Sequence, residues 1–417
     1  MPQSLKKTLK SIAPEALISG YHYMLAFAAA LRYRFPSRSI FVVAVTGTKG
    51  KTTVTELVNS ILEEAGFKTA LAGTLRFKIG KDSKRNLHKM TMPGRFFMQK
   101  FLRQAVEADC HYSIIEMTSE GVKQFRHKWI ELDSLIFTNL SPEHIESHGS
   151  YENYVRAKLE LGKALEKSNK GRRVLVVNKD DKESGRFLAL NVPQKKTFSL
   201  EEASPYLLKD DGLEMALGGG RLKTRLLGIF NIYNILAAVR FAESQNISPE
   251  IIKRALEKFE GVAGRVQFID SGQSFGAVVD YAHTPDSLKK LYQTFPDKNL
   301  ICVLGNTGGG RDKWKRKEMA KIAEQYCSEI ILTNEDPYDE DPRAIVDGMA
   351  DGMKNKKAKI IMDRRKAIQA ALKSANPGDI VLITGKGTDP YIMGPAGSRE
   401  EWDDATVVRE ELERLNK

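Results

Sequence analysis

The sequence of 417 residues has little cysteine, little proline and no tract of low complexity. Its three cysteines, Cys110, Cys302 and Cys327, are too few and too scattered for a disulfide framework or a zinc site. A reducing, cytoplasmic location is therefore the default expectation. The balance of 32 glycines and 15 prolines with 41% hydrophobic residues excludes collagenous and largely disordered chains and predicts two or three globular domains.

The uncharged apolar stretch at residues 16–31 is shorter than a membrane span, and no cleavage site of small residues follows it. The flanking basic residues are Lys6, Lys7 and Lys10 before it and Arg32, Arg34 and Arg38 after it. Two interpretations stay open. The stretch is either a helix packed on the body of the protein or an interfacial helix that makes peripheral contact with an anionic membrane.

Positive charge is in excess, with 65 lysines and arginines against 53 aspartates and glutamates, a net charge of +12. This surplus favours anionic partners such as nucleotides, phosphorylated metabolites, nucleic acid or an acidic membrane face. The sequence has no nucleic-acid recognition module and no interleaved aromatic platform, so we expect no nucleic-acid partner. Small anionic substrates explain the charge better.

Short β-branched runs alternate with helical segments, which predicts an α/β protein with mostly parallel sheets. The predicted strands are residues 40–45, 112–117, 134–140 and 173–178, then 275–283, 300–306, 329–334, 359–363 and 379–385. A β-rich insertion is expected near residues 186–226, and residues 261–265 read as a domain junction. The predicted organisation is a helical segment at 1–37, a central P-loop ATPase-like domain at 38–261 and a Rossmann-like C-terminal domain at 262–417.

The strongest local motif lies between the first predicted strand and an amphipathic helix. It consists of Thr46, Gly47, Thr48, Lys49, Gly50, Lys51, Thr52 and Thr53. Glycines let backbone N–H groups turn toward phosphate oxygens, and the helix N-terminus adds its positive end. Lys51 would reach the β- and γ-phosphates of ATP and Thr52 would bind Mg²⁺, although Val45 occupies the first glycine position of the usual motif.

Together with this loop, seven further motifs resemble those of the Mur ligases, in the order that this family has them. They are IIEMTSEG at 114–121, TNLSPEH at 138–144, GIFNIYN at 228–234, GR at 264–265, DYAHTPD at 280–286, GGGRDK at 308–313 and GKGTD at 385–389. Within the family, they most resemble the enzymes that add the third peptide residue to UDP-N-acetylmuramoyl-L-alanyl-D-glutamate. The resemblance implies an ATP- and Mg²⁺-dependent amide ligase of peptidoglycan precursor synthesis that acts through an acyl phosphate. We expect a monomer. The uridine-nucleotide domain that precedes the phosphate loop in such enzymes is expected to be absent here.

The resemblance also assigns residues to ATP and to the metal. Asn234 would bind adenine, Arg265 the γ-phosphate on domain closure, and Asp280 and His283 the ribose and phosphates. Glu116, His144 and a carbamylated Lys158 would bind Mg²⁺. Lys51, Lys158 and His283 are thus the catalytic candidates. The residues alone also allow ordinary structural roles, such as a helix cap for Asn234 or a solvated helix lysine for Lys158.

The substrate-binding motifs of the family are changed in this chain. The acceptor residues would be Thr91, Met92, Thr118, Gln124 and Arg126, with Met92 replacing a second threonine. The amino-acid residues would be Arg311, Glu335, Asp336, Tyr338, Gly385 and Asp389. Tyr338 replaces an arginine that grips the distal carboxylate of diaminopimelate. We therefore expect the acidic residues to accept the side-chain ammonium of lysine or ornithine instead.

Two other functions stay open at this stage. A folylpolyglutamate-synthetase-like ligase shares the phosphate loop, the domain plan and the modified lysine. An ATP-binding scaffold at the membrane that has lost catalysis would bind ATP without ligation. A folate-dependent ATPase signal would favour the first alternative, and retention of Lys51, Glu116, His144, Lys158 and Arg265 argues against the second.

Overall fold

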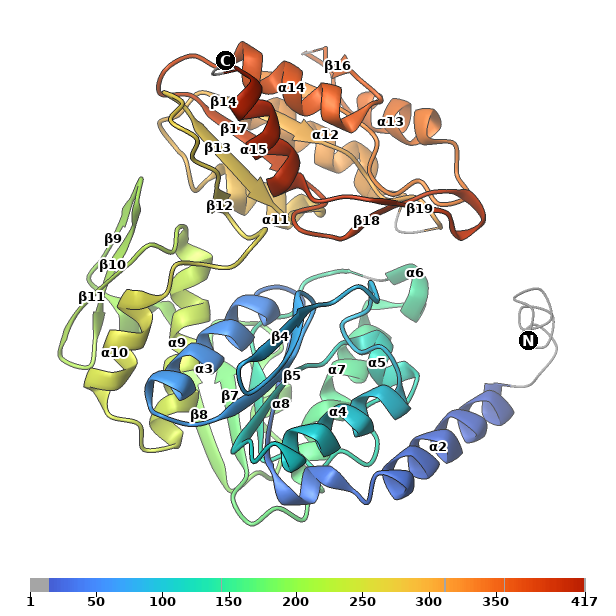
Figure 1. Ribbon diagram of the computed structural model, residues 1–417, viewed down its shortest axis with the longest axis vertical. Helices are drawn as coiled ribbons and strands as arrows, with labels where there is room; N and C mark the ends of the chain where they lie inside the picture. Colours follow the sequence, from blue (N-terminus) through green and yellow to red (C-terminus); the bar gives the residue numbers. More distant parts are fainter. Residues whose placement is uncertain (1–14, 144, 311–312, 356, 416–417) are drawn as a thin grey trace. The chain divides into compact units, whose positions relative to one another are not determined.

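The computed structural model describes residues 15–143, 145–310, 313–355 and 357–415 (Figure 1). These residues form two compact units, which we describe separately. The first unit takes its described residues from Met1–Glu143, His148–Ser204 and Tyr233–Leu256, and the second takes them from His144–Ser147, Pro205–Ile232 and Glu257–Lys417. Residues 205–232 thus group with the C-terminal half of the chain. The predicted boundaries at 37/38 and 261/262 remain a prediction.

The first unit is built on an eight-stranded sheet with the order β4-β3-β2-β5-β1-β6-β7-β8. Its strands are β1 (Phe41–Thr46), β2 (Thr69–Ala72), β3 (Arg76–Ile79), β4 (Asp82–Arg85), β5 (Tyr112–Glu116), β6 (Ser134–Phe137), β7 (Val174–Asn178) and β8 (Gln194–Phe198). The six strands from β2 to β8 in this order pair in parallel, whereas β3 and β4 add an antiparallel edge. The parallel sheet predicted for the central domain is confirmed.

Helices cover this sheet, which explains why its central strands β5, β1 and β6 are buried at nearly every position and mostly apolar. The helices of this unit are α3 (Lys51–Glu64), α4 (Arg95–Glu107), α5 (Ser119–Lys123), α7 (Tyr151–Glu166) and α8 (Ser184–Leu188). Three further helices have residues in both units: α6 (Ile145–His148), α9 (Ile229–Ser244) and α10 (Pro249–Lys258). Val42 and Ala44 of β1 belong to the hydrophobic core that includes Leu102 of α4 and Leu161 of α7. The sheet therefore fixes the ends of its strands rigidly, and the phosphate loop follows one of them.

The predicted N-terminal helix is present as α2 (Glu15–Arg32), which lies beside α4 (Figure 1). Ala26, Ala29 and Ala30 are buried, and Phe27 packs against Trp129 with ring centroids 5.0 Å apart. The opposite stripe is apolar as well but exposed, with Tyr21 and Met24 62% and Leu31 58% accessible. No helix among the described residues is long and apolar enough to span a membrane. The helix thus packs on the body and still presents an apolar face.

The second unit contains a six-stranded sheet with the order β12-β13-β17-β14-β15-β16, parallel except for β12. Its strands are β12 (Gln267–Phe268), β13 (Gly276–Asp280), β14 (Leu300–Leu304), β15 (Glu329–Leu332), β16 (Lys359–Ile360) and β17 (Ile380–Thr384). Its helices are α11 (Pro285–Tyr292), α12 (Lys315–Tyr326), α13 (Pro342–Ala350), α14 (Arg364–Ser374) and α15 (Asp404–Leu415). Alternate strand residues contribute to two cores, one with α11 to α13 and one with α14 and α15. The predicted α/β C-terminal domain is confirmed.

Two small antiparallel sheets complete this unit. They are formed by β9 (Tyr206–Lys209), β10 (Gly212–Leu217) and β11 (Gly220–Thr224), and by β18 (Tyr391–Met393) and β19 (Arg399–Glu401). The first sheet falls within the β-rich insertion expected near residues 186–226.

The cysteines differ from the expectation of scattered, unpaired thiols. Cys302 of β14 and Cys327, the residue after α12, form a disulfide with their Cα atoms 6.1 Å apart. The packing of α12 on β14 brings the two residues together, which their spacing in the sequence does not reveal. Cys110 is buried and free.

Candidate phosphate-loop ligase site

The phosphate loop joins β1 to α3, as predicted, and two of its glycines are required by their surroundings. Gly47 and Gly50 have φ angles of +147° and +82°. A Cβ on Gly47 would lie 2.0 Å from Thr138 Oγ1, and one on Gly50 would lie 2.3 Å from Asn234 Oδ1. Gly50 also precedes α3 without any side-chain cap, so the first turn of the helix faces the loop with its N–H groups.

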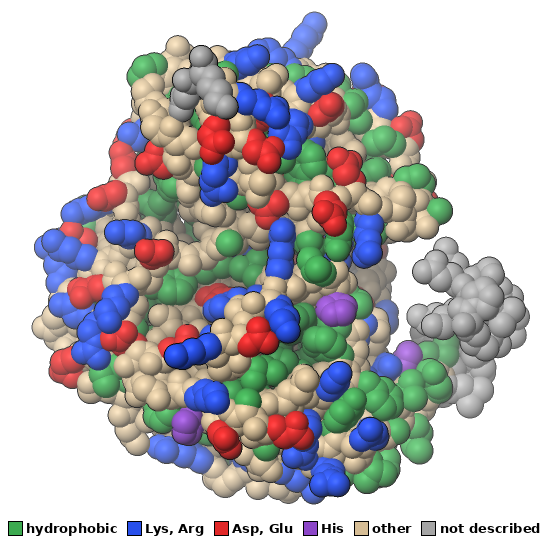
Figure 2. Space-filling model, in the orientation of Figure 1, with side chains coloured by type: hydrophobic (Ala, Val, Ile, Leu, Met, Phe, Trp, Pro, Cys, Tyr) green, Lys and Arg blue, Asp and Glu red, His purple; other side chains and the backbone are tan. Residues whose placement is uncertain are grey.

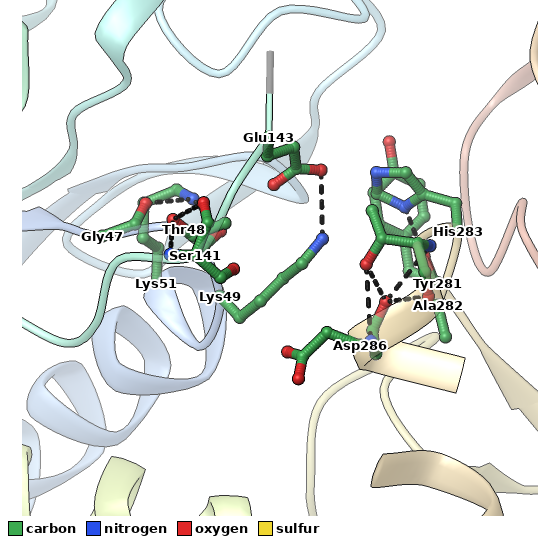
Figure 3. Close-up of polar contacts among 12 residues, drawn as sticks. Gly47, Thr48, Lys49, Lys51, Ser141, Glu143, Tyr281, Ala282, His283 and Asp286 are labelled. Carbon is green, nitrogen blue, oxygen red and sulfur yellow. Dashed lines mark hydrogen bonds and ion pairs between the residues drawn. The ribbon is translucent and has the colours of Figure 1, made fainter. Parts of the chain in front are cut away.

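Two lysines of the loop are held in different ways (Figure 3). Lys51 Nζ donates to the carbonyl oxygens of Gly47 and Thr48, each at 2.9 Å, so its ammonium lies inside the curl of the loop. Lys49 Nζ forms an ion pair with Glu143 at 3.1 Å. The arrangement keeps one positive charge at the centre of the loop, where phosphate oxygens would need it.

A chain of oxygen atoms leads away from the start of α3. Thr52 Oγ1 donates to Glu116 Oε2 at 3.2 Å, and Thr74 Oγ1 donates to the same oxygen at 2.8 Å. Glu116 is 1% exposed. The hydroxyl of Thr91 extends this series of hydrogen bonds, because it lies 2.9 Å from the hydroxyl of Thr74. A hydroxyl and a carboxylate are hard oxygen ligands of the kind that Mg²⁺ prefers. The predicted pair of Thr52 and Glu116 is therefore brought together in a form that fits this metal.

The structure gives less information on the other predicted metal ligands. His144 lies outside the described residues. The described part of the chain contains no group of three or more His, Cys, Asp or Glu side chains arranged to hold a metal ion. A metal at Glu116 would therefore depend on the Thr52 hydroxyl and on ligands from phosphate or from a modified side chain.

Lys158 is the buried lysine of α7, only 2% exposed, and it points at the phosphate loop. Its Nζ donates to Gly47 O at 2.6 Å. Burial and then the positive charge of Lys51 lower the pKa of Lys158 well below its ordinary value. Such a lysine is easily held as a neutral amine, which is the form that reacts with CO₂.

Asn234 of α9 is buried against the loop at Gly50, as the predicted adenine residue should be if it serves the same nucleotide. The backbone N–H groups of Thr48 and Lys49 donate to Asn139, at 2.8 and 2.9 Å. Thr53 is buried in the first turn of α3.

The predicted acceptor residues gather around the start of α5. Thr118 caps this helix by accepting from Gly121 N at 3.1 Å, and Gln124 Oε1 accepts from Arg126 Nη2 at 2.6 Å. Arg126 Nη1 also donates to the carbonyl oxygen of Met92. The Met92 side chain is buried in the hydrophobic core, so its backbone, rather than its side chain, faces this arginine.

In the second unit, Arg265, Asp280 and His283 lie around the carboxyl end of β13. The Arg265 guanidinium lies 4.4 Å from the ring centroid of Tyr281, and Asp280 accepts from the N–H groups of Val266 and Ala282 at 2.8 and 2.6 Å. Burial raises the pKa of Asp280, and the charge of Arg265 opposes the shift. His283 Nδ1 is 2.7 Å from the carbonyl oxygen of Tyr281 (Figure 3). Because a carbonyl oxygen only accepts, Nδ1 is the donor in this contact.

The acidic residues of the expected amino-acid pocket differ in their interaction partners. Lys386 Nζ forms ion pairs with Asp336 at 2.9 Å and Asp389 at 3.1 Å, and donates to Tyr391 O at 2.6 Å. Lys386 is 1% exposed, so it offsets one of the two negative charges inside the protein and leaves the group of three with a net charge of −1. The ion pairs with Lys386 compete with a substrate ammonium at Asp336 and Asp389, and the expectation that these aspartates receive it stays a prediction.

Glu335 is an acidic residue that could take a cation. Its Oε1 accepts from Thr307 Oγ1 at 2.7 Å, whereas its buried Oε2 has no hydrogen-bond partner among the described residues. Oε2 faces Gly385, where a Cβ would lie 2.3 Å away and φ is +104°. Tyr338 has a φ of +53° and packs on Gly309, and Arg311 lies outside the described residues.

Three residues near these sites were not predicted. Thr74 connects Glu116 to Thr91, Lys386 forms ion pairs with the two aspartates, and Arg95 lies beside Arg126. The lysine stands inside the GKGTD motif, which marked the segment but not its role. The other two have no local signal, because their roles depend on contacts between distant segments.

Comparison with known proteins identifies the class to which this site belongs. The family model described as the Mur ligase middle domain matches residues 45–242, and the one described as Mur ligase, glutamate ligase domain, matches residues 264–387. The chain therefore belongs to the Mur ligase family, and it is an enzyme of the ATP-dependent class that forms amide bonds.

Particular relatives narrow the comparison. The chain is 38% identical over 404 residues to the UDP-N-acetylmuramoyl-L-alanyl-D-glutamate–2,6-diaminopimelate ligase of Syntrophomonas wolfei, covering 93% of this chain and 81% of the relative. It is 34% identical to the same ligase of Oceanobacillus iheyensis, covering 94% and 82%. A solved structure of a ligase with this name has a TM-score of 0.60 at 30% identity, covering 91% of this chain and 79% of that chain. Folylpolyglutamate synthase of Mycobacterium tuberculosis shares the fold alone, with a TM-score of 0.71 at 15% identity and coverage of 99% and 97%.

Proposed function

We propose that this protein adds an amino acid to a UDP-N-acetylmuramoyl-L-alanyl-D-glutamate acceptor, at the expense of ATP, in peptidoglycan precursor synthesis. The observation that supports this most directly is the set of Lys51, Thr52, Glu116 and buried Lys158 around one phosphate loop. A loop that only bound nucleotide would not need a buried lysine with a lowered pKa beside it.

The reaction has two steps. A carboxylate oxygen of the acceptor attacks the γ-phosphorus of ATP, which forms an acyl phosphate and releases ADP. The amine of the incoming amino acid then attacks the acyl carbon, expels inorganic phosphate and loses a proton. Such chemistry needs held phosphates and oriented reactants more than a protein nucleophile.

We assign Gly47 to Thr53, with Asn234, Arg265, Asp280 and His283, to ATP. Lys51 would neutralise charge on the transferred phosphoryl group. Thr52 and Glu116, with His144 and carbamylated Lys158, would hold Mg²⁺, which when bound offsets negative charge on the phosphates. The carbamate would form when the neutral amine of Lys158 adds CO₂ and releases a proton, and the charges of Lys51 and Lys49 would favour the resulting anion.

We assign Thr91, Thr118, Gln124 and Arg126, with the backbone at Met92, to the acceptor. For the incoming amino acid we propose lysine or ornithine. The buried Oε2 of Glu335 suits a side-chain ammonium, and Tyr338 stands where the diaminopimelate-adding enzymes have an arginine. Arg311, Gly385 and the ion-paired Asp336 and Asp389 would shape this pocket.

A coupled assay of phosphate release tests the proposal. The purified protein is supplied with ATP, Mg²⁺, the UDP-muramoyl dipeptide, and lysine, ornithine or diaminopimelate in turn. Phosphate release that requires both acceptor and amino acid supports the proposal, and a clear preference for diaminopimelate would refute the basic-amino-acid assignment. Release that depends on a folate would favour the folylpolyglutamate type, and ATP binding without release would favour a scaffold.

The proposal extends to the setting of the reaction. We infer a cytoplasmic monomer whose helix α2 makes peripheral contact with an anionic membrane. Figure 2 shows hydrophobic side chains gathered with basic ones over α2, and Tyr21, Met24 and Leu31 are exposed there near Arg32. Co-sedimentation with vesicles tests the contact. Binding to phosphatidylglycerol vesicles that is lost in Met24→Asp would support it, and equal pelleting of both proteins would refute it.

A further inference from the structure

Two arginines, Arg95 and Arg126, contact one glutamine, Gln124. Arg95, the first residue of α4, donates from Nη2 to the backbone carbonyl oxygen of Gln124 at 2.5 Å. Arg126 donates from Nη2 to the side-chain oxygen of the same glutamine at 2.6 Å. Gln124 thus contacts two guanidinium groups, whose like charges repel each other.

The carboxylate of Glu120 partly offsets the charge of Arg126 without forming a salt bridge with it. Within the part of the chain that the structure describes, neither arginine forms a salt bridge, and the buried Nε of Arg95 has no hydrogen-bond partner. Burial lowers the pKa of Arg95 and the charge of Arg126 lowers it further; burial also lowers the pKa of Arg126, against the opposing effect of Glu120. A buried donor without a partner, beside a second cation, calls for a bound anion.

Two non-glycine residues near Arg126 have positive φ angles, a backbone conformation that costs free energy. Phe125, between Gln124 and Arg126, has a φ of +57°, and Trp129 has a φ of +63°. Both rings pack against α2, since Tyr23 lies 6.2 Å from Phe125 and 5.7 Å from Trp129 between ring centroids. A strained loop fixed by the aromatic side chains of another helix is typical of a site that must be preorganised.

The position of the pair narrows the identity of the anion. Hydrogen bonds connect Glu116 to Thr74 and Thr74 to Thr91, and the carbonyl oxygen of the next residue, Met92, accepts from Arg126. The arginines are therefore only a few side chains from the residues assigned to the phosphates. An anion this close to the reacting carboxylate belongs to the same residue of the acceptor rather than to a distant diphosphate.

We propose that Arg95 and Arg126 together bind the second carboxylate of the acceptor's acidic residue, the one that is not phosphorylated, and that Arg95 determines specificity for it. The inference rests on the proposed function. A planar guanidinium binds a carboxylate through two parallel hydrogen bonds, and two guanidinium groups also fix its orientation. The reacting carboxylate is thereby turned toward ATP.

The test compares two acceptors and four proteins. The acceptors are UDP-muramoyl-L-alanyl-D-glutamate and its D-isoglutamine analogue, which keeps the reacting γ-carboxylate but replaces the other by an amide. The proteins are wild type, Arg95→Ala, Arg95→Lys and the control Lys100→Ala, an exposed residue of the same helix. Steady-state kcat and KM are measured for acceptor, ATP and amino acid, and circular dichroism melting confirms that each variant folds.

Arg95→Ala should raise the acceptor KM by about 10- to 100-fold, the loss expected for a hydrogen bond to a charged group. The KM for ATP should stay within about twofold, Arg95→Lys should be intermediate, and Lys100→Ala should match wild type. With the isoglutamine acceptor, wild type should already be impaired and Arg95→Ala should cost little more. An unchanged acceptor KM, or an equal loss on both acceptors, would overturn the inference.

Calorimetric titration of each acceptor into the protein without ATP separates this inference from the proposed function. If wild type ligates the acceptor but binding does not depend on Arg95, the inference fails and the function stands. If no ligation occurs but the dicarboxylate acceptor binds in an Arg95-dependent way, the function fails and the inference stands. Wild-type protein that binds neither acceptor overturns both.

Discussion

Replacement of Lys158 by methionine should remove activity and at the same time stabilise the protein. Methionine has a similar volume and no charge, so it fills the space under the phosphate loop without the amine that donates to Gly47 O. The loss of the proposed metal ligand should lower kcat by at least about 10³-fold, in line with the removal of a preorganised electrostatic group. Replacement of a lysine whose ionised form is disfavoured by burial with a packed apolar group should raise the free energy of unfolding by about 1–4 kcal/mol at pH 7.

The effect on stability should depend on pH in a defined direction. Lys158 has a folded-state pKa well below its ordinary value of 10.5. Between these two values the unfolded chain binds more protons than the folded chain, so wild-type stability rises with pH across this window. The advantage of Lys158→Met should therefore be largest below the folded pKa and should shrink as pH approaches 10.5.

Urea unfolding at several pH values, combined with the phosphate-release assay, measures both effects. Lys163→Met is the matched control, because Lys163 lies on the same helix, is partly exposed and pairs with Glu160 at 2.8 Å. This control should change the unfolding free energy by less than about 0.5 kcal/mol. Wild-type protein in ¹³C-bicarbonate should show a carbamate signal that the variant lacks. A fully active Lys158→Met, or one that is strongly destabilised, would refute the reasoning.

Three other perturbations separate the parts of the site. Lys51→Ala should abolish ligation, with kcat lowered by about 10²-fold or more and the fold intact by circular dichroism; normal turnover would exclude the lysine from the phosphate site. Glu335→Gln should raise the KM for lysine by about 10- to 100-fold while the KM for ATP is unchanged, and an unaffected lysine KM would remove Glu335 from the amino-acid pocket. Reduction of the disulfide between Cys302 and Cys327, 25 residues apart, should lower the unfolding free energy by about 3 kcal/mol. Identical melting curves with and without reductant would contradict this.

Features that depend on neighbouring residues were predicted well from the sequence. The apolar run at residues 40–45 predicted β1. The glycines that follow it form the loop because they adopt positive φ angles and leave no side chain to collide with neighbouring atoms. In contrast, β2 with four residues is too short for its periodicity to distinguish a strand from a loop. The helix at residues 16–31 was located correctly because an uncharged stretch of that length has few alternatives.

Features that depend on distant partners were not visible. The acidic segment at 335–336 suggested two carboxylates for one substrate, but Lys386 forms an ion pair with Asp336 that competes with a substrate cation there. Arg95 gave no signal, because only the fold places it beside Arg126. The disulfide likewise depends on how α12 packs against β14. Charge in a sequence is thus a poor guide to charge in a site until the pairing of each group is known.

The helix α2 also has a consequence for the order in which the chain is made. It leaves the ribosome before α4 and Trp129, whose side chains cover its inner face and come much later in the sequence. Until then both its inner and its outer apolar faces are accessible. A nascent chain that stalls before residue 129 would therefore be prone to aggregate or to recruit a chaperone, whereas the finished protein covers the inner face and keeps the stripe of Tyr21, Met24 and Leu31 exposed.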